Sequence, residues 1–221
     1  MKVLAVVSSK GGTAKSTTAA ELAVAAARRG QRVLVMDLDQ QGNVSGRMGI
    51  TADTEVGFTA DVLLREATIA EAATPAPSVP GAWVIAGTHQ LATLDMQPAV
   101  VMTLSRLLPA VAGEWDVIVL DTAPALSPLT LSGIAAANQI IVPLECKTEA
   151  YDQLSRLAPA IAQVTPGETF RWIVPTKYDS RRRLDREVLE VLTEDYPGRV
   201  TSPIRETIAA ADSYTVGMPV S

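Results

Sequence analysis

Short, solidly apolar runs alternate with longer stretches of helical periodicity along most of this chain. The runs are rich in Val, Ile and Leu and lack regularly spaced polar positions, as in "VLAVVS" and "DVIVLDTA". Strands covered on both faces of a parallel sheet have this composition, because neither face meets water. We therefore expect strands over residues 3–8, 32–39, 82–87, 116–123, 139–144 and 171–176.

The gaps between these runs carry helical patterns. An alanine-rich stretch runs from Ser16 to Arg29, and Gly30 directly after it is suited to end a helix. The proline-rich segment 74–81 is expected to be a surface connection, too short to link two domains. Strands that alternate with helices favour a single doubly wound α/β domain over residues 1–221, with a mostly parallel sheet flanked by helices. Helices are predicted over 16–29, 97–112, 127–137, 149–164 and 183–195.

Composition and charge narrow the class of protein. The net charge is −5 and the pI about 5.0, so a nucleic-acid contact would need a local basic patch. The single cysteine, Cys146, excludes a disulfide framework and suits a reducing cytoplasm. The N-terminal "KVLAVVSS" leads into a glycine loop and does not read as a cleaved signal peptide. No apolar run approaches the roughly 18 residues that a membrane span needs.

The first predicted strand leads directly into "KGGTAKST", which opens the first helix. Gly11 and Gly12 let the backbone turn its N–H groups inward, where the helix N-terminus adds partial positive charge. Lys15 is placed to reach the β- and γ-phosphates of a nucleotide, and Ser16 to offer its hydroxyl to Mg²⁺. Ala14 stands where the usual pattern has glycine, which is tolerable if its φ is negative. The predicted nucleotide contacts of this loop are Lys10, Gly11, Gly12, Thr13, Ala14, Lys15, Ser16 and Thr17.

Two of the predicted strands end in aspartates. Asp37 and Asp39 close the strand "VLVMDLD", and residues two apart on a strand face the same way. Asp121 ends the apolar strand "DVIVLD", which is the arrangement of a Walker B strand whose aspartate holds Mg²⁺, usually through water. Ser16 and Asp121 are therefore the predicted metal-binding residues, and Asp39 is an additional candidate.

The extra lysine, Lys10, gives the loop the deviant Walker A pattern K-G-G-x-x-K-[ST]. Through this pattern the sequence resembles the ParA/MinD family of P-loop ATPases, most strongly the small ParA proteins that segregate plasmids and chromosomes. The resemblance implies that Lys10 crosses a dimer interface to the phosphates of the partner's ATP. It also implies that Asp39 positions the attacking water in switch I, with Asp37 in a supporting role. The expected catalytic residues are Lys10, Lys15 and Asp39.

The resemblance covers almost the whole chain and includes departures from the family pattern. In D-x-D-P-Q-G-N the proline is replaced by Gln40, and in D-T-P-P the first proline is replaced by Ala123. Near the C-terminus, "SPIRETIAAADSYTVGMPV" resembles the family's I-P-R…E-A…G-x-P segment, with Asp212 in step. By the same resemblance, four residues are expected to frame the adenine base: Thr176, Lys177, Ile204 and Arg205.

A run of arginines, Arg181 to Arg183, surrounds the start of the last predicted helix. Helix starts favour acidic residues, so this run indicates a function. In ParA relatives the pattern T-x-x-D-x-R-T-x-L carries an arginine that contacts DNA, and Arg181 matches it. A second family arginine falls on Ala209, so Arg182, Arg183 and Arg199 are expected to compensate, because non-specific binding needs several phosphate contacts.

These features lead to the expectation of a weak ATPase that partitions DNA in the cytoplasm, on the nucleoid. ATP would close a sandwich homodimer that binds DNA without sequence preference, and a ParB-like centromere-binding partner would stimulate hydrolysis; no membrane contact is expected. Two alternatives stay open. A MinD-like membrane or cargo positioner would co-sediment with vesicles in the presence of ATP. A metabolic P-loop ligase would form product without any macromolecule.

Overall fold

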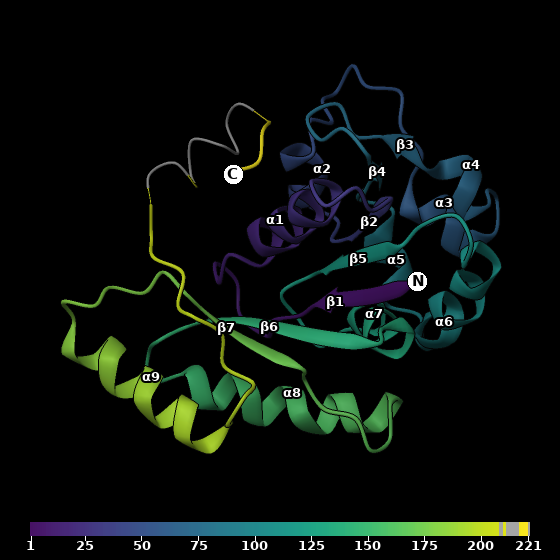
Figure 1. The fold of residues 1–221 in the computed structure, drawn as a ribbon. Coiled ribbons are helices and arrows are strands. Elements are labelled where there is room, and N and C mark those ends of the chain that lie inside the picture. Colours follow the sequence, from purple (N-terminus) through teal and green to yellow (C-terminus); the bar gives the residue numbers. More distant parts are fainter. Residues whose placement is uncertain (208–209, 211–216, 221) are drawn as a thin grey trace.

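The computed structural model describes residues 1–207, 210 and 217–220, so the expectations for Ala209 and Asp212 lie outside the described residues. The strands of the described part are β1 (Lys2–Val6), β2 (Val33–Leu38), β3 (Thr74–Pro75), β4 (Ala82–Ile85), β5 (Val117–Thr122), β6 (Gln139–Glu145) and β7 (Trp172–Thr176). They form one sheet in the order β3-β4-β2-β5-β1-β6-β7 (Figure 1). All neighbours pair in parallel except β3 with β4. The expected mostly parallel sheet is confirmed.

Helices cover both faces of this sheet (Figure 1). Along β2, Val33 and Val35 join the core cluster beneath α1, while Leu34 and Met36 join the larger cluster on the opposite face. This alternation explains why the strands are apolar throughout. In the described ranges, no helix is long and apolar enough to cross a membrane. The α-helices are α1 (Lys15–Ala27), α2 (Asn43–Arg47), α3 (Thr59–Leu64), α4 (Ile69–Ala72), α5 (Leu91–Leu94), α6 (Thr103–Leu107), α7 (Pro128–Ala136), α8 (Ala150–Val164) and α9 (Arg183–Asp195).

Two sequence predictions about the fold are wrong. The helix expected over 97–112 is three short pieces, the 3₁₀ helix η1 (Pro98–Met102), α6, and the 3₁₀ helix η2 (Leu108–Val111). Each 3₁₀ piece has a proline in its first two positions, and proline lacks the N–H that a continuous helix would need there. The segment 74–81 is also more than a connection, because its first two residues form β3. Pro75 is tolerated there because β3 is an edge strand.

The sheet register brings the predicted chemistry together at one edge. Asp121 on β5 lies opposite Val6 of β1 on one side and opposite Asp37 of β2 on the other. Parallel strands end at the same edge, so the loop after β1 and the acidic ends of β2 and β5 meet there.

Candidate functional site

The loop between β1 and α1 borders a cavity of about 400 Å³. Buried hydroxyl groups stabilise the loop from below. Thr13 Oγ1 donates to Ser8 Oγ (2.9 Å), and Ser8 Oγ donates to the carbonyl of Lys10 (2.8 Å). The amide of Gln153, on α8, donates to Ser8 Oγ at 3.3 Å. The loop is therefore fixed from below while its upper side faces the cavity. The lining consists of the predicted residues Lys10, Gly11, Gly12, Thr13, Ala14, Lys15, Ser16 and Thr17, together with Asp39, Asn43, Arg47 and Pro124.

Ala14 corrects one expectation about this loop. Its φ is +60°, in the left-handed region, whereas a negative φ was the condition for tolerating alanine there. A Cβ in this region crowds the following carbonyl, at a cost of roughly 1–2 kcal/mol. The turn is held in place because the carbonyl of Ala14 accepts hydrogen bonds from the N–H and the hydroxyl of Thr18, at 2.8 and 2.9 Å. The loop thus keeps a left-handed backbone conformation at position 14 although the residue there is alanine.

Ala14→Gly is expected to raise the free energy of unfolding by about 1 kcal/mol, because glycine adopts the left-handed region without a Cβ penalty. Urea denaturation of the nucleotide-free protein measures this change. Ala25→Gly, in the interior of α1, is the matched control and should lower the free energy of unfolding by about 1 kcal/mol. Equal losses in both variants would contradict the strain assigned to Ala14.

Lys15 and Asp121 form a buried ion pair at the floor of the cavity. Lys15 Nζ lies 3.5 Å from Asp121 Oδ1, and the two side chains are 7% and 0% exposed. Burial raises the pKa of Asp121, and the Lys15 charge opposes this shift. A lysine held at this depth beside a carboxylate places a fixed positive charge under the loop.

The second oxygen of this carboxylate indicates a missing ligand. Asp121 Oδ2 is buried and has no hydrogen-bond partner among the described residues. An unpaired buried carboxylate oxygen is costly, so a cation or a cation-bound water would satisfy it. Ser16 and Asp39 border the cavity above Lys15 and offer further oxygen donors. This donor set fits a hard divalent cation such as Mg²⁺.

The two aspartates at the end of β2 have different surroundings. Asp39 lines the cavity, and its Oδ1 accepts the N–H of Gln41 at 3.0 Å. Asp37 is fully buried and accepts three hydrogen bonds, from the N–H of Asp39 (3.0 Å) and from the N–H and hydroxyl of Ser45 (3.2 and 2.8 Å). Burial and the nearby charge of Asp121 raise the pKa of Asp37 to about 7. Asp37 therefore holds the 39–45 loop in place, and Asp39 faces the site.

The sequence alone did not reveal the support beneath this loop. The N–H of Gly87, after β4, donates to Ser45 Oγ at 3.4 Å. A Cβ on Gly87 would lie 2.2 Å from the carbonyl oxygen of Asp39, so only glycine fits there without a shift. Arg47, at the end of α2, was also missed, although it lines the loop cavity. A glycine at the end of a predicted strand and a basic residue shortly after "QQGN" were the available signals.

Lys10 lies in a different environment from Lys15. Its side chain is 49% exposed, and its nearest acidic partner is Glu149 at 3.9 Å, itself 55% exposed. Exposed pairs of this kind contribute little to stability, because water screens both charges. Lys10 is therefore free to leave Glu149 at little cost.

A larger cavity of about 1170 Å³ adjoins the loop on the β7 side. Thr176, at the end of β7, connects that strand to the loop, because its Oγ1 donates to the carbonyl of Thr13 at 3.1 Å. Lys177 follows in the left-handed region, with φ +52°, and its Nζ lies 3.1 Å from Glu145. Trp172 contributes to a partly apolar wall. All four residues predicted to frame the base line this cavity, and their contact with a base stays a prediction: Thr176, Lys177, Ile204 and Arg205.

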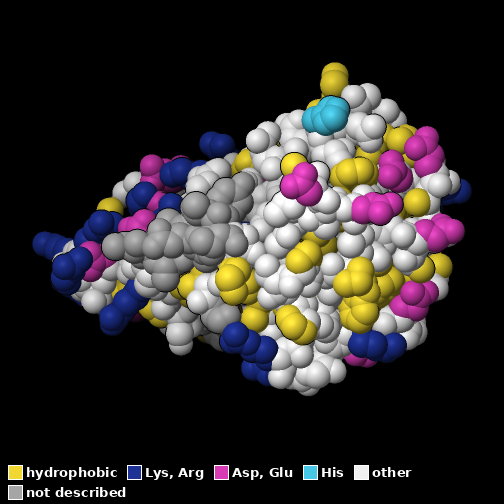
Figure 2. Space-filling view, turned by 90° about the horizontal axis from the view of Figure 1, so that it is seen from above, with side chains coloured by type: hydrophobic (Ala, Val, Ile, Leu, Met, Phe, Trp, Pro, Cys, Tyr) yellow, Lys and Arg dark blue, Asp and Glu magenta, His cyan; other side chains and the backbone are white. Residues whose placement is uncertain are grey.

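The predicted DNA-binding arginines lie at the start of α9, where Figure 2 shows Lys and Arg side chains gathered among acidic ones. Arg181 binds Asp179 through two nitrogens, each at 2.9 Å, and Arg182 lies 3.8 Å from the same carboxylate. Arg183 instead pairs with Glu187 at 2.6 Å. All three side chains are exposed, which an approaching polyanion requires.

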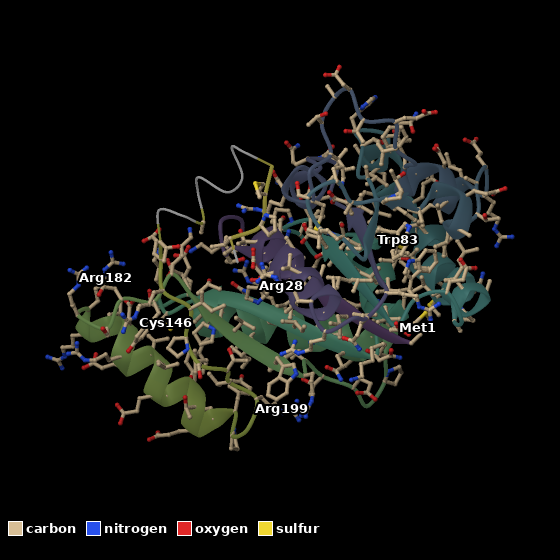
Figure 3. The ribbon with its side chains drawn as sticks, turned by 45° about the horizontal axis from the view of Figure 1, so that its top comes forward. Met1, Arg28, Trp83, Cys146, Arg182 and Arg199 are labelled. Atoms are coloured by element: carbon tan, nitrogen blue, oxygen red, sulfur yellow. The ribbon has the colours of Figure 1, made fainter. Side chains whose placement is uncertain are left out.

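Arg199 is not part of this group. It follows the far end of α9, and its guanidinium donates to the carbonyl of Phe170 at 2.8 Å. Arg182 and Arg199 lie far apart in Figure 3, at opposite ends of the helix. The structure therefore does not bring Arg199 to the arginines at the start of α9, and its expected compensation for the arginine missing at Ala209 stays a prediction. Elsewhere in the described part of the chain, Cys146 is buried and His89 is exposed.

Comparison with known proteins identifies the family to which this chain is similar. A family model described as an AAA domain matches residues 1–169. The chromosome partitioning protein ParA of Caulobacter vibrioides is 31% identical over 231 residues, which cover 100% of this chain and 86% of that protein. The chromosome-partitioning ATPase Soj of Thermus thermophilus is 33% identical over 219 residues, covering 96% of this chain and 84% of that protein.

Among solved structures, the cobyrinic acid a,c-diamide synthase of Mycobacterium smegmatis with bound ADP and magnesium has a TM-score of 0.83 at 32% identity. The match covers 97% of this chain and 91% of that one. Because the partitioning relatives exceed 30% identity over nearly their whole length and the family model spans most of the chain, this protein belongs to the family of ParA-type partition ATPases.

Proposed function

We propose that this chain hydrolyses ATP to ADP and phosphate as the switch of a DNA partition system. ATP closes a sandwich homodimer, the dimer binds DNA without sequence preference, and a ParB-like centromere-binding partner stimulates a slow hydrolysis. One observation carries the proposal, namely that the two lysines of the loop have opposite surroundings. Lys15 is buried against Asp121, whereas the side chain of Lys10, on the same loop, is half exposed. One lysine is placed for the subunit's own nucleotide and the other is available to a neighbour's.

Each subunit supplies its own phosphate and metal contacts in this proposal. Lys15 and the N–H groups from Gly11 to Thr17 bind the phosphates, because the turn and the start of α1 present donors and partial positive charge. Ser16 and Asp121 would hold Mg²⁺, with Asp39 as an additional contact. When bound, Mg²⁺ neutralises charge on the β- and γ-phosphate oxygens. Thr176, Lys177 and Ile204 frame the adenine base in the larger cavity.

Asp39 orients the water that attacks the γ-phosphate, and Asp37 acts as its positioning residue. The hydrogen bonds from Gly87 through Ser45 to Asp37, and from Asp39 to Asp37, support this assignment. They hold the backbone of Asp39 in place although Gln40 replaces the proline that the family pattern has there.

DNA binding is assigned to the arginines at the start of α9. Two-fold pairing of subunits doubles their number, which favours binding to a polyanion by a chain whose net charge is −5. Binding to chromosomal DNA would place the protein in the cytoplasm, on the nucleoid.

Replacing Arg181, Arg182 and Arg183 together by alanine is expected to abolish DNA binding and leave ATP-dependent dimerisation intact. The reason is that the three charges supply phosphate contacts and none of them lines the loop cavity. Fluorescence anisotropy with duplex DNA measures binding, and sedimentation with ATP measures dimerisation. Parental binding should also weaken steeply as salt is added. Full DNA affinity in the triple variant would move the DNA site elsewhere on the protein.

A small-molecule synthase is a second candidate, favoured by two observations. The Mycobacterium smegmatis protein of similar structure is named as a synthase, and the cavity beside the loop, at about 1170 Å³, has room for more than a nucleotide base. A synthase of this kind would turn over ATP with its small-molecule substrate alone. ATP turnover that rises with DNA and a centromere-binding protein, and not with such a substrate, favours the partition role.

A further inference from the structure

We infer that Arg205 contacts DNA phosphates as the third arginine of an anion-binding cavity that it shares with Arg181 and Arg182. This inference rests on the proposed DNA binding. It gives Arg205 a different ligand from the adenine base that the family resemblance implies.

The cavity lies where two distant segments of the chain meet. Tyr178 and Arg205 form a parallel β-bridge, in which the N–H of Tyr178 donates to the carbonyl of Ile204 at 3.0 Å. The N–H of Ile204 in turn donates to the carbonyl of Pro175 at 2.8 Å. These bonds fix Arg205 beside the loop that leads into α9. Between them is a cavity of about 660 Å³, lined by Tyr178, Asp179, Ser180, Arg181, Arg182, Arg205, Glu206 and Thr207.

The charges around this cavity favour an anion. Arg181 and Arg182 share the carboxylate of Asp179, so two guanidinium groups face one negative charge. Within the described residues, the guanidinium of Arg205 makes no hydrogen bond or ion pair. The lining therefore holds three positive groups against two negative ones, counting Glu206. Guanidinium groups bind phosphate through paired N–H donors, and Arg205 has all of its donors available.

The same geometry argues against a base contact by the Arg205 side chain. Arg205 also borders the larger cavity, but that wall includes Trp172, Val174 and Ile141. A guanidinium that packed on these apolar side chains would give up water, and the carboxylates of the same lining belong to Glu21 and Glu206. Arg205 is exposed, so its side chain can stay in water and meet a phosphate strand together with Arg181.

The test compares Arg205→Ala with a control variant that removes the same charge. Arg156→Ala removes an exposed arginine of α8 and controls for net charge alone. Each ATP-bound protein is titrated with one duplex DNA at several salt concentrations, ATP affinity is measured by calorimetry, and circular dichroism confirms folding. Arg205→Lys keeps the charge and loses the paired donors.

Arg205→Ala is expected to lower the salt slope of log K by about 1 for each contacting subunit, which is about an eightfold loss per contact at 0.1 M salt. Its ATP affinity should stay at the parental value, and Arg205→Lys should bind DNA with intermediate affinity. If the Arg205→Ala variant bound DNA like the parent and bound ATP more weakly, the inference would be overturned, and Arg205 would be assigned to the adenine base. Parental values for both ligands, or an equal loss in Arg156→Ala, would overturn it as well. Absence of DNA binding by the parent protein would instead overturn the proposed DNA function and this inference with it.

Discussion

Lys15→Ala is expected to weaken ATP binding by about 100-fold or more. Lys15 is the buried cation of the loop, and a charge-assisted hydrogen bond to phosphate contributes about 1.5–3 kcal/mol before the loss of long-range attraction is counted. The variant also leaves Asp121 buried without its partner, which costs about 3 kcal/mol of stability. Isothermal calorimetry with Mg-ATP, well below the melting temperature of the variant, measures the effect.

Lys147→Ala is the matched control for this substitution. Lys147 is an exposed lysine that pairs with Glu145 and does not line the loop cavity, so its removal changes the net charge by the same amount. The control should keep the parental ATP affinity. A Lys15→Ala protein that is folded and binds ATP as tightly as the parent would rule out the phosphate site assigned to residues 10–17.

Mixing Lys10→Ala subunits with Asp39→Ala subunits is expected to restore hydrolysis that neither variant shows alone. Asp39→Ala should keep ATP and stay dimeric, because it removes the positioning of water and no phosphate contact. Lys10→Ala should keep most of its ATP affinity, since Lys15 and the loop N–H groups remain, but dimerise weakly. In the heterodimer, one site has its own Asp39 and receives Lys10 from the Asp39→Ala subunit. That site is complete, so about half of the sites should work, as for a charge supplied in trans.

The structure gives a physical reason to expect this transfer. Lys10 is tied to Glu149 only by an exposed contact of 3.9 Å, so moving to an anion across an interface costs little. Partner-stimulated ATPase activity of the purified heterodimer is the measurement. If Lys10 acts only on its own subunit's nucleotide, each site carries one defect and the heterodimer stays inactive. That result, with the heterodimer shown to form, would end the assignment of separate roles to the two lysines.

The parts that could be predicted from sequence are those that neighbouring residues decide. Solid apolar runs predicted six of the seven strands in the described part of the chain, and the sheet they form is mostly parallel. The residues from Lys10 to Thr17 line the cavity and form one continuous segment. The spacing of glycine, lysine and serine within this segment was therefore enough to predict it. The start of α9 was predicted at Arg183, where the helical pattern and the arginine run coincide. Local periodicity contains this information because strands and helices repeat over a few residues.

The tertiary structure decided which distant residues meet and which conformations are forced. Strand order placed Asp121 beside Lys15, and the Asp37–Ser45–Gly87 hydrogen bonds join the 39–45 loop to the turn after β4. The sequence motif left the sign of φ at Ala14 open, and the structure shows that it is positive. Arg205 lies near the arginines at the start of α9 only because the β-bridge to Tyr178 brings the two segments together. Such contacts depend on how the elements pack around the whole sheet, and no short stretch of sequence specifies that packing.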